Sequence, residues 1–186
     1  MSRTVQIVLL CEDQQQETFV RRFLKSAGWP TRRLRVEKTP RAGGSAEQYV
    51  RERFPIELAA YRRNRHRVAQ GLVVVCDGDH YGVAARISQL EAACRAQNTD
   101  PRRADEVVVL LIPTWNIETW LAYLSGMDVD ERQDNYARLE RERDCQPQVN
   151  ALHEMCQQRV LREPAPSSLE AACVEYRRLQ NAQQRR

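Results

Sequence analysis

The sequence predicts an α/β fold, with a mainly parallel four-stranded sheet flanked by helices and a helical extension at the C-terminal end. Short apolar runs alternate with longer amphipathic segments, which is the order of strands and helices in a parallel sheet. The clearest run, residues 72–76, is continuously apolar, as expected for a strand that is covered on both faces. The chain has 186 residues, of which 42% are hydrophobic, and this is enough to bury a core.

The strands of this sheet are predicted at residues 5–11, 33–39, 72–76 and 107–112. The first run is rich in β-branched side chains and ends at a polar stretch. The second run alternates Leu34 and Val36 with charged residues, which indicates a half-exposed strand or one at a sheet edge. The third run is expected at the centre of the sheet.

The helices are expected at residues 16–27, 45–69, 83–97 and 113–124. Ser45 offers an N-cap for the second of them, and Pro55 is expected to bend it. After Gly126 the sequence becomes charged and poor in aromatic residues, so we assign residues 1–126 to an α/β domain and residues 127–186 to a helical extension. That extension is expected to form three modest helices, interrupted by Pro147, Pro164 and Pro166.

Simple counts exclude several classes of protein. No apolar run approaches the roughly 20 residues of a membrane-spanning helix, and the first residues show no signal-peptide pattern. We therefore expect a cytoplasmic protein without a membrane partner. The six cysteines form no Cys-x-x-Cys pair and the three histidines are scattered, so we expect reduced structural thiols and no zinc site.

The net charge of +4 conceals a basic segment. Residues 21–67 hold 14 arginines and lysines against four glutamates, whereas the rest of the chain carries more acidic than basic residues. Such a segment is typical of a surface that binds a polyanion. We predict nucleic-acid contacts at Arg51, Arg62, Arg63 and Arg65. The alternative is a solvated helix whose arginines pair with its own glutamates.

Acidic residues directly follow two of the predicted strands. Glu12 comes after the first, and Asp77, Gly78 and Asp79 come after the third. Because parallel strands end at the same edge of a sheet, about 4.8 Å apart, we expect these carboxylates to approach one another. They would repel each other without a divalent cation, and oxygen ligands open to water suit Mg²⁺ or Mn²⁺. Gly78 is expected to leave the backbone free to aim both aspartates, and His80 is a candidate contact to a phosphate or an incidental loop residue.

This arrangement resembles the TOPRIM domains of topoisomerases, primases and small nucleases, in which one strand ends in a glutamate and a later strand ends in Asp-x-Asp. The corresponding segments here are residues 9–12 and 74–79, and the resemblance covers about residues 4–125. Residues 116–120, with the sequence Asn-Ile-Glu-Thr-Trp, resemble a segment that follows the last strand in compact bacterial members such as the OLD-type nucleases. Glu118 is thus a fourth acidic candidate.

Two positions depart from the family pattern. Asp13 stands where the family usually has glycine. Glu17, the next acidic residue of the following helix, comes five residues after Glu12 where four is usual. For this reason Glu17 is left out of the predicted site.

The resemblance implies a TOPRIM-like, Rossmann-like fold and a Mg²⁺- or Mn²⁺-dependent nuclease that hydrolyses DNA or RNA. Glu12, Asp77, Asp79 and Glu118 would be its catalytic residues, and the first three would bind the metal. It also implies a role as an antiphage-defence effector, with an ATPase as the protein partner. Two alternatives stay open: a non-catalytic TOPRIM-like subunit that docks such a partner, and a nucleotidyl- or phosphotransferase that uses the same edge.

Overall fold

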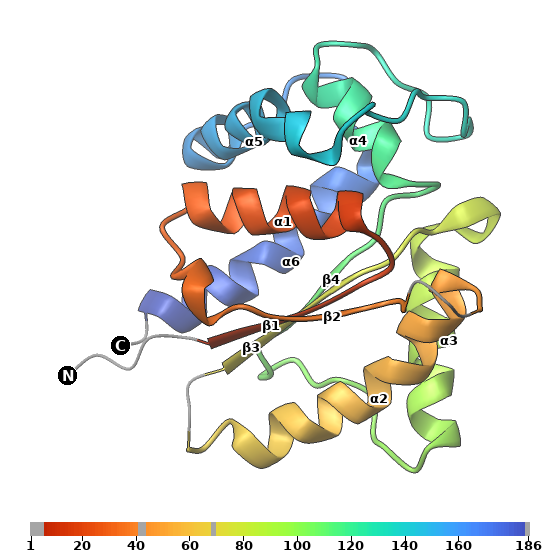
Figure 1. The fold of residues 1–186 in the computed structure, drawn as a ribbon, viewed down its shortest axis with the longest axis vertical. Helices are drawn as coiled ribbons and strands as arrows, with labels where there is room; N and C mark the ends of the chain where they lie inside the picture. Colours follow the sequence, from red (N-terminus) through yellow and green to blue (C-terminus); the bar gives the residue numbers. More distant parts are fainter. Residues whose placement is uncertain (1–5, 41–43, 68–69, 185–186) are drawn as a thin grey trace.

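The computed structural model describes residues 6–40, 44–67 and 70–184. They form one four-stranded sheet in which every strand runs parallel to its neighbours, in the order β2-β1-β3-β4 (Figure 1). The strands are β1 (Gln6–Cys11), β2 (Arg35–Lys38), β3 (Gln70–Val75) and β4 (Val108–Leu111). The predicted α/β fold with a parallel four-stranded sheet is confirmed.

The strand positions follow the predicted runs closely. β1, β2 and β4 lie within them, and β3 begins two residues before its run. Residue 5 lies outside the described residues. β2, which was expected to be half-exposed or at an edge, lies at an edge of the sheet, and β3 lies between two other strands as predicted.

Six α-helices and three short 3₁₀ helices are present in the described residues. The α-helices are α1 (Gln14–Ser26), α2 (Ala46–Asn64), α3 (Gly82–Ala96), α4 (Ile117–Leu124), α5 (Gln146–Gln158) and α6 (Ser167–Gln184). The 3₁₀ helices are η1 (Thr31–Arg33), η2 (Asp79–Tyr81) and η3 (Glu142–Cys145). Helix α2 ends five residues earlier than predicted, although residues 68–69 are outside the described residues. Its N-cap is the predicted Ser45, which accepts a hydrogen bond from the backbone N–H of Gln48.

The helices cover both faces of the sheet, as the continuous apolar strands require. Helices α2 and α3 lie on one face, where Phe54 and Leu90 pack against strand residues such as Leu10. Helices α1, α4, α5 and α6 lie on the other face, where Phe19 and Leu169 pack against the intervening strand residues (Figure 1). Successive strand side chains point to opposite faces, so each strand contributes to both apolar clusters.

The C-terminal segment differs from its prediction in one respect. The described residues after Gly126 contain two α-helices and one 3₁₀ helix, and Pro147 lies in the first turn of α5 rather than between two helices. Proline is compatible with that position because the first N–H groups of a helix have no intrahelical acceptor. Pro164 and Pro166 do precede α6. Both α5 and α6 share one apolar cluster with α1 and α4.

Side chains also cover the outer edge of β4. The backbone N–H of Leu110 donates to Glu175 Oε2 (3.0 Å), and the Val108 carbonyl accepts from Arg102 Nη1 (2.9 Å). Arg102 also forms two hydrogen bonds with Glu175, which lies on α6. An open strand edge is a template for pairing with another chain, and these contacts close it.

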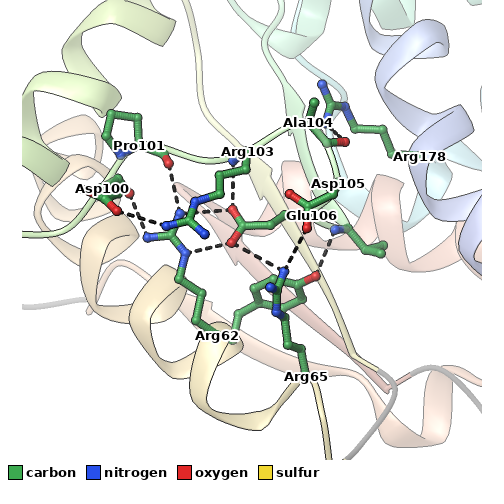
Figure 2. A network of polar contacts seen from close by, with 11 residues as sticks. Arg62, Arg65, Asp100, Pro101, Arg103, Ala104, Asp105, Glu106 and Arg178 are labelled. Atoms are coloured by element: carbon green, nitrogen blue, oxygen red, sulfur yellow. Dashed lines mark hydrogen bonds and ion pairs between the residues drawn. The ribbon is translucent and has the colours of Figure 1, made fainter.

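A buried ion-pair network joins the end of α2 to the loop before β4 (Figure 2). Glu106, whose side chain has no exposed surface, accepts hydrogen bonds from Arg62 Nε (2.7 Å) and Arg62 Nη2 (3.0 Å). Arg62 also donates to the carbonyls of Asp100 (2.8 Å) and Pro101 (2.9 Å). Arg65 lies 3.7 Å from Glu106. Two of the predicted nucleic-acid contacts thus have structural partners in the loop.

None of the helices in the part of the chain described here combines the length and apolarity needed to cross a bilayer.

We predict that Glu106→Gln lowers the free energy of unfolding by about 2–4 kcal/mol, because it leaves the Arg62 guanidinium without its charged partner in a largely buried site. Urea denaturation would measure the loss. The control is Arg63→Ala, at an exposed neighbouring position, which should change the free energy by about 0.5 kcal/mol or less. Equal stability of Glu106→Gln and the wild type would contradict a structural role for this network.

Candidate functional site

The parallel pairing of β1 and β3 brings Glu12 and Asp77 together. Cys11 is in register with Val75, so the residues that follow these strands meet at the carboxyl edge of the sheet. The backbone N–H of Asp77 donates to Glu12 Oε1 (2.9 Å). Gln16 completes a ring, because it accepts from the Glu12 N–H (2.9 Å) and donates to Asp77 Oδ1 (2.9 Å).

The start of α1 explains how Gln16 reaches this position. Asp13 is the N-cap of the helix, and its Oδ1 accepts a hydrogen bond from the backbone N–H of Gln16 (2.9 Å). A capping carboxylate satisfies a helix N–H that has no other partner. The capping role gives Asp13 a structural function at the start of α1. Gln16, which is fully buried, is a site residue that sequence reasoning missed.

Gly78 is required by a close approach of two backbones. Its φ of −75° is accessible to any residue, so the expected conformational freedom is not the reason for glycine here. A Cβ at this position would lie 2.7 Å from the carbonyl oxygen of Pro113 and closer still to that of Thr114. The Gly78 N–H donates to the Pro113 carbonyl (2.8 Å), which ties the turn after β3 to the segment after β4.

Arg86, on α3, holds the second aspartate of the turn. Its side chain is only 2% exposed, and it donates to the Asp77 carbonyl (2.8 Å) and to Asp79 Oδ2 (2.6 Å). It also forms an ion pair with Glu47 (2.5 Å). Sequence reasoning missed Arg86, although its position three residues after Val83 and four before Leu90 on the apolar face of the helix was a usable signal.

Glu118 reaches the same edge from the first turn of α4. Its side chain is mostly buried, and its Oε1 lies 3.9 Å from Arg138 Nε. Arg138 also donates to Asp13 Oδ2 (3.0 Å). The sequence contained no signal for Arg138, because it lies in a segment without regular structure between α4 and η3. We call the five acidic side chains at this edge the carboxylate edge: Glu12, Asp13, Asp77, Asp79 and Glu118.

Burial and mutual repulsion raise the pKa values of the central carboxyl groups. The pKa of Asp77 rises to about 9, mainly through burial and then through the charges of Glu12 and Glu118. Burial raises the pKa of Glu12 to about 7, although the hydrogen bond from the Asp77 N–H opposes this shift. Burial also raises the pKa of Glu118. A cation among these groups would favour their ionised forms.

The donor set suits a hard divalent cation. Glu12, Asp77 and Asp79 each use one carboxylate oxygen in a side-chain hydrogen bond, and the other oxygen has no such partner among the described residues. In the same described ranges, no three His, Cys, Asp or Glu side chains converge closely enough to form a complete metal cage. Mg²⁺ keeps several waters and is commonly held by one or two carboxylates, so the residues present fit it.

The predicted nucleic-acid contacts are divided between the two edges of the sheet. Arg62 and Arg65 lie in the network before β4, at the amino edge, and Arg63 on the same end of α2 is exposed. Arg51 lies 3.2 Å from Glu47, which also pairs with Arg86. This contact within α2 matches the alternative of a helix whose arginines pair with its own glutamates.

His80 lies at the carboxyl edge, directly after the Asp77–Asp79 turn, and is exposed. Its ring lies 3.8 Å from that of Tyr81 and 6.5 Å from that of Trp115, measured between centroids. No hydrogen bond to His80 is present among the described residues.

No protein-family profile, curated protein or solved structure matches this chain. The resemblance to TOPRIM domains therefore stays a prediction from the residues.

We predict that Asp77→Asn stabilises the metal-free protein by about 2 kcal/mol at pH 8, or roughly 4–8 °C in melting temperature. The folded-state pKa of Asp77, about 9, lies above its ordinary value of 3.8, so the folded state binds more protons between these values. The wild type should therefore lose stability as pH rises from about 4 to about 9, and the variant should lose less.

Thermal unfolding in a chelator, at several pH values, would measure this difference. Asp134→Asn is the control, because Asp134 is exposed and its side chain forms no hydrogen bond or ion pair among the described residues. If the stabilities of the wild type and Asp77→Asn change with pH in the same way, ionisation of Asp77 does not destabilise the folded protein, and the prediction is wrong.

Proposed function

We propose that this protein is a Mg²⁺- or Mn²⁺-dependent nuclease that hydrolyses phosphodiester bonds in DNA or RNA at the carboxylate edge. One observation carries the proposal: Glu12 and Asp77, from the ends of neighbouring parallel strands, share a hydrogen-bonded ring in which burial raises both pKa values. Such a pair is costly without a cation, and perturbed carboxyl groups are characteristic of active sites. Asp79 and Glu118 lie at the same edge.

The side chains have distinct roles in this proposal. Asp77 and Asp79 would hold the metal through the oxygens that have no side-chain hydrogen bond. Arg86 keeps Asp79 in place, and Gln16 orients Asp77. When bound, the metal would offset negative charge on the phosphate and promote ionisation of a water. Glu12, with a pKa of about 7, is suited to accept a proton from that water near neutral pH, or to be a further ligand.

The wider role follows from the family resemblance alone. It suggests an effector of antiphage defence with an ATPase as partner, and the basic residues of α2 and the loop residue His80 remain candidates for contact with nucleic acid. Arg51 and His80 are on the carboxyl side of the sheet, whereas Arg63 would contact only a ligand that extends to the amino edge.

The second candidate is a non-catalytic TOPRIM-like subunit that docks a partner. Two observations favour it: no three metal-ligating side chains converge within the described residues, and Asp79 is drawn to Arg86. In this case the carboxylate edge would be structural: it would hold a structural ion or no ion, and it would not support hydrolysis. Turnover therefore separates the two candidates.

We predict that Mg²⁺ or Mn²⁺ stabilises the wild type in a thermal-shift titration and that Asp77→Asn abolishes this shift. At about 100 times the dissociation constant, the gain should be about 2.7 kcal/mol, or roughly 5–10 °C. Asp134→Asn is again the control and should keep the full shift. A shift of the same size in Asp77→Asn would place the metal elsewhere.

We also predict that Glu12→Gln lowers hydrolysis of single- and double-stranded DNA and RNA at least about 100-fold, because glutamine cannot accept the proton. The amide keeps an oxygen for the hydrogen bond from the Asp77 N–H, so the fold should be retained. Initial rates from gel-resolved products would measure the loss. Full turnover in Glu12→Gln, or no turnover by the wild type with any of these substrates, would favour the non-catalytic candidate.

A further inference from the structure

The negative charge of the carboxylate edge opposes the binding of a nucleic acid. Five acidic side chains lie there, and a phosphodiester is itself an anion, so a substrate would be repelled unless cations face it. A bound metal would supply part of the compensation. The remaining compensation must come from basic side chains near the carboxylates.

Two arginines form ion pairs with the carboxylate edge among the described residues. Arg86 pairs with Asp79 at 2.6 Å, and Arg138 pairs with Asp13 at 3.0 Å. Arg86 is 2% exposed and its guanidinium is occupied by protein acceptors, so it cannot meet a ligand. The side chain of Arg138 is 55% exposed. Of these two arginines, Arg138 is therefore the one that a ligand can reach.

The guanidinium of Arg138 has N–H donors that form no hydrogen bond with the described residues. Its Nη2 donates to Asp13 Oδ2, and its Nε lies 3.9 Å from Glu118, beyond hydrogen-bond distance. Its Nη1 has no hydrogen-bond partner within the described ranges. A guanidinium presents five N–H donors in a planar fork that matches a phosphate, so a phosphate can bind while the contact with Asp13 is kept.

The surrounding segment holds Arg138 in place from both sides. Next to it, Leu139 packs against the apolar cluster of α1, α4, α5 and α6. Upstream, Glu131 accepts hydrogen bonds from Thr114 Oγ1 (2.9 Å) and Ser167 Oγ (2.7 Å), which ties the segment to the region after β4 and to the start of α6. The position of Arg138 at the edge is thus built into the fold.

We infer that Arg138 is a substrate-binding residue that contacts the phosphodiester backbone at the carboxylate edge. This inference rests on the proposed function. It assigns a role to the segment between α4 and η3, which lies outside the region that resembles TOPRIM domains. This segment places the positively charged Arg138 beside Asp13 and Glu118.

The test is a binding measurement that needs no turnover. Fluorescein-labelled single strands of DNA and RNA, about 20 nucleotides long, and their duplexes would be titrated with protein in Ca²⁺ at several salt concentrations. Arg138→Ala should weaken binding about tenfold and reduce the slope of log K against log salt by about one, because one phosphate contact is lost. Arg138→Lys should keep the slope but not the full affinity.

The matched control is Arg132→Ala. Arg132 lies on the same segment, is 89% exposed and forms an ion pair with Asp130. Its replacement by alanine removes one positive charge, as Arg138→Ala does, but at a position that is not paired with the carboxylate edge. It should leave affinity and slope unchanged. The Arg138 variants should also keep the wild-type shift in melting temperature with Mn²⁺, which shows that the fold and the metal site are intact.

The inference is overturned if Arg138→Ala binds as the wild type does, if Arg132→Ala loses as much affinity, or if the wild type binds none of the probes. Arg138 would then be a counter-ion for Asp13 only. Failure of the proposed function looks different: binding would depend on Arg138, but the wild type would hydrolyse nothing, or Glu12→Gln would retain full turnover.

Discussion

The parallel pairing of β1 with β3 is the constraint on which the rest of the site depends. It brings two strand ends together, where backbone N–H groups leave the sheet and need new acceptors. Glu12 and Gln16 provide them, since Glu12 accepts from the Asp77 N–H and Gln16 accepts from the Glu12 N–H. The same contacts place two half-buried carboxyl groups side by side. A local requirement for hydrogen bonding thus creates the environment that raises the pKa values of Glu12 and Asp77.

The arginines of this chain have different roles at the two edges of the sheet. At the amino edge, Arg62 is bound to Glu106 and to loop carbonyls, so part of the basic excess of residues 21–67 stabilises the fold rather than a free surface. At the carboxyl edge, a buried arginine fixes the Asp77–Asp79 turn and an exposed arginine reaches Asp13. The net charge of a segment could not distinguish structural arginines from exposed ones, because it does not show which acidic side chains or carbonyls each arginine contacts.

The proposed nuclease activity fits the position of the site in the fold. Open parallel sheets bind ligands beyond the carboxyl ends of their strands, and here acidic side chains follow β1, β3 and β4 at that edge. Fold alone does not determine function, so the function is argued from the site itself. The rival, a docking subunit, shares the fold but catalyses no hydrolysis, whether its carboxylates hold a structural ion or none.

The amino-acid sequence was enough to predict the four strands, their order along the chain and the placement of Glu12, Asp77 and Asp79 after two strands. These features follow from local apolar patterns, which are encoded in neighbouring residues. The folded structure was needed to show that the approach of the Thr114 carbonyl requires Gly78, and that Arg86 and Arg138 lie at the site. Those contacts are set by packing: Asp13 and Arg138 are 125 positions apart, and no local pattern records which residues the folded chain brings together.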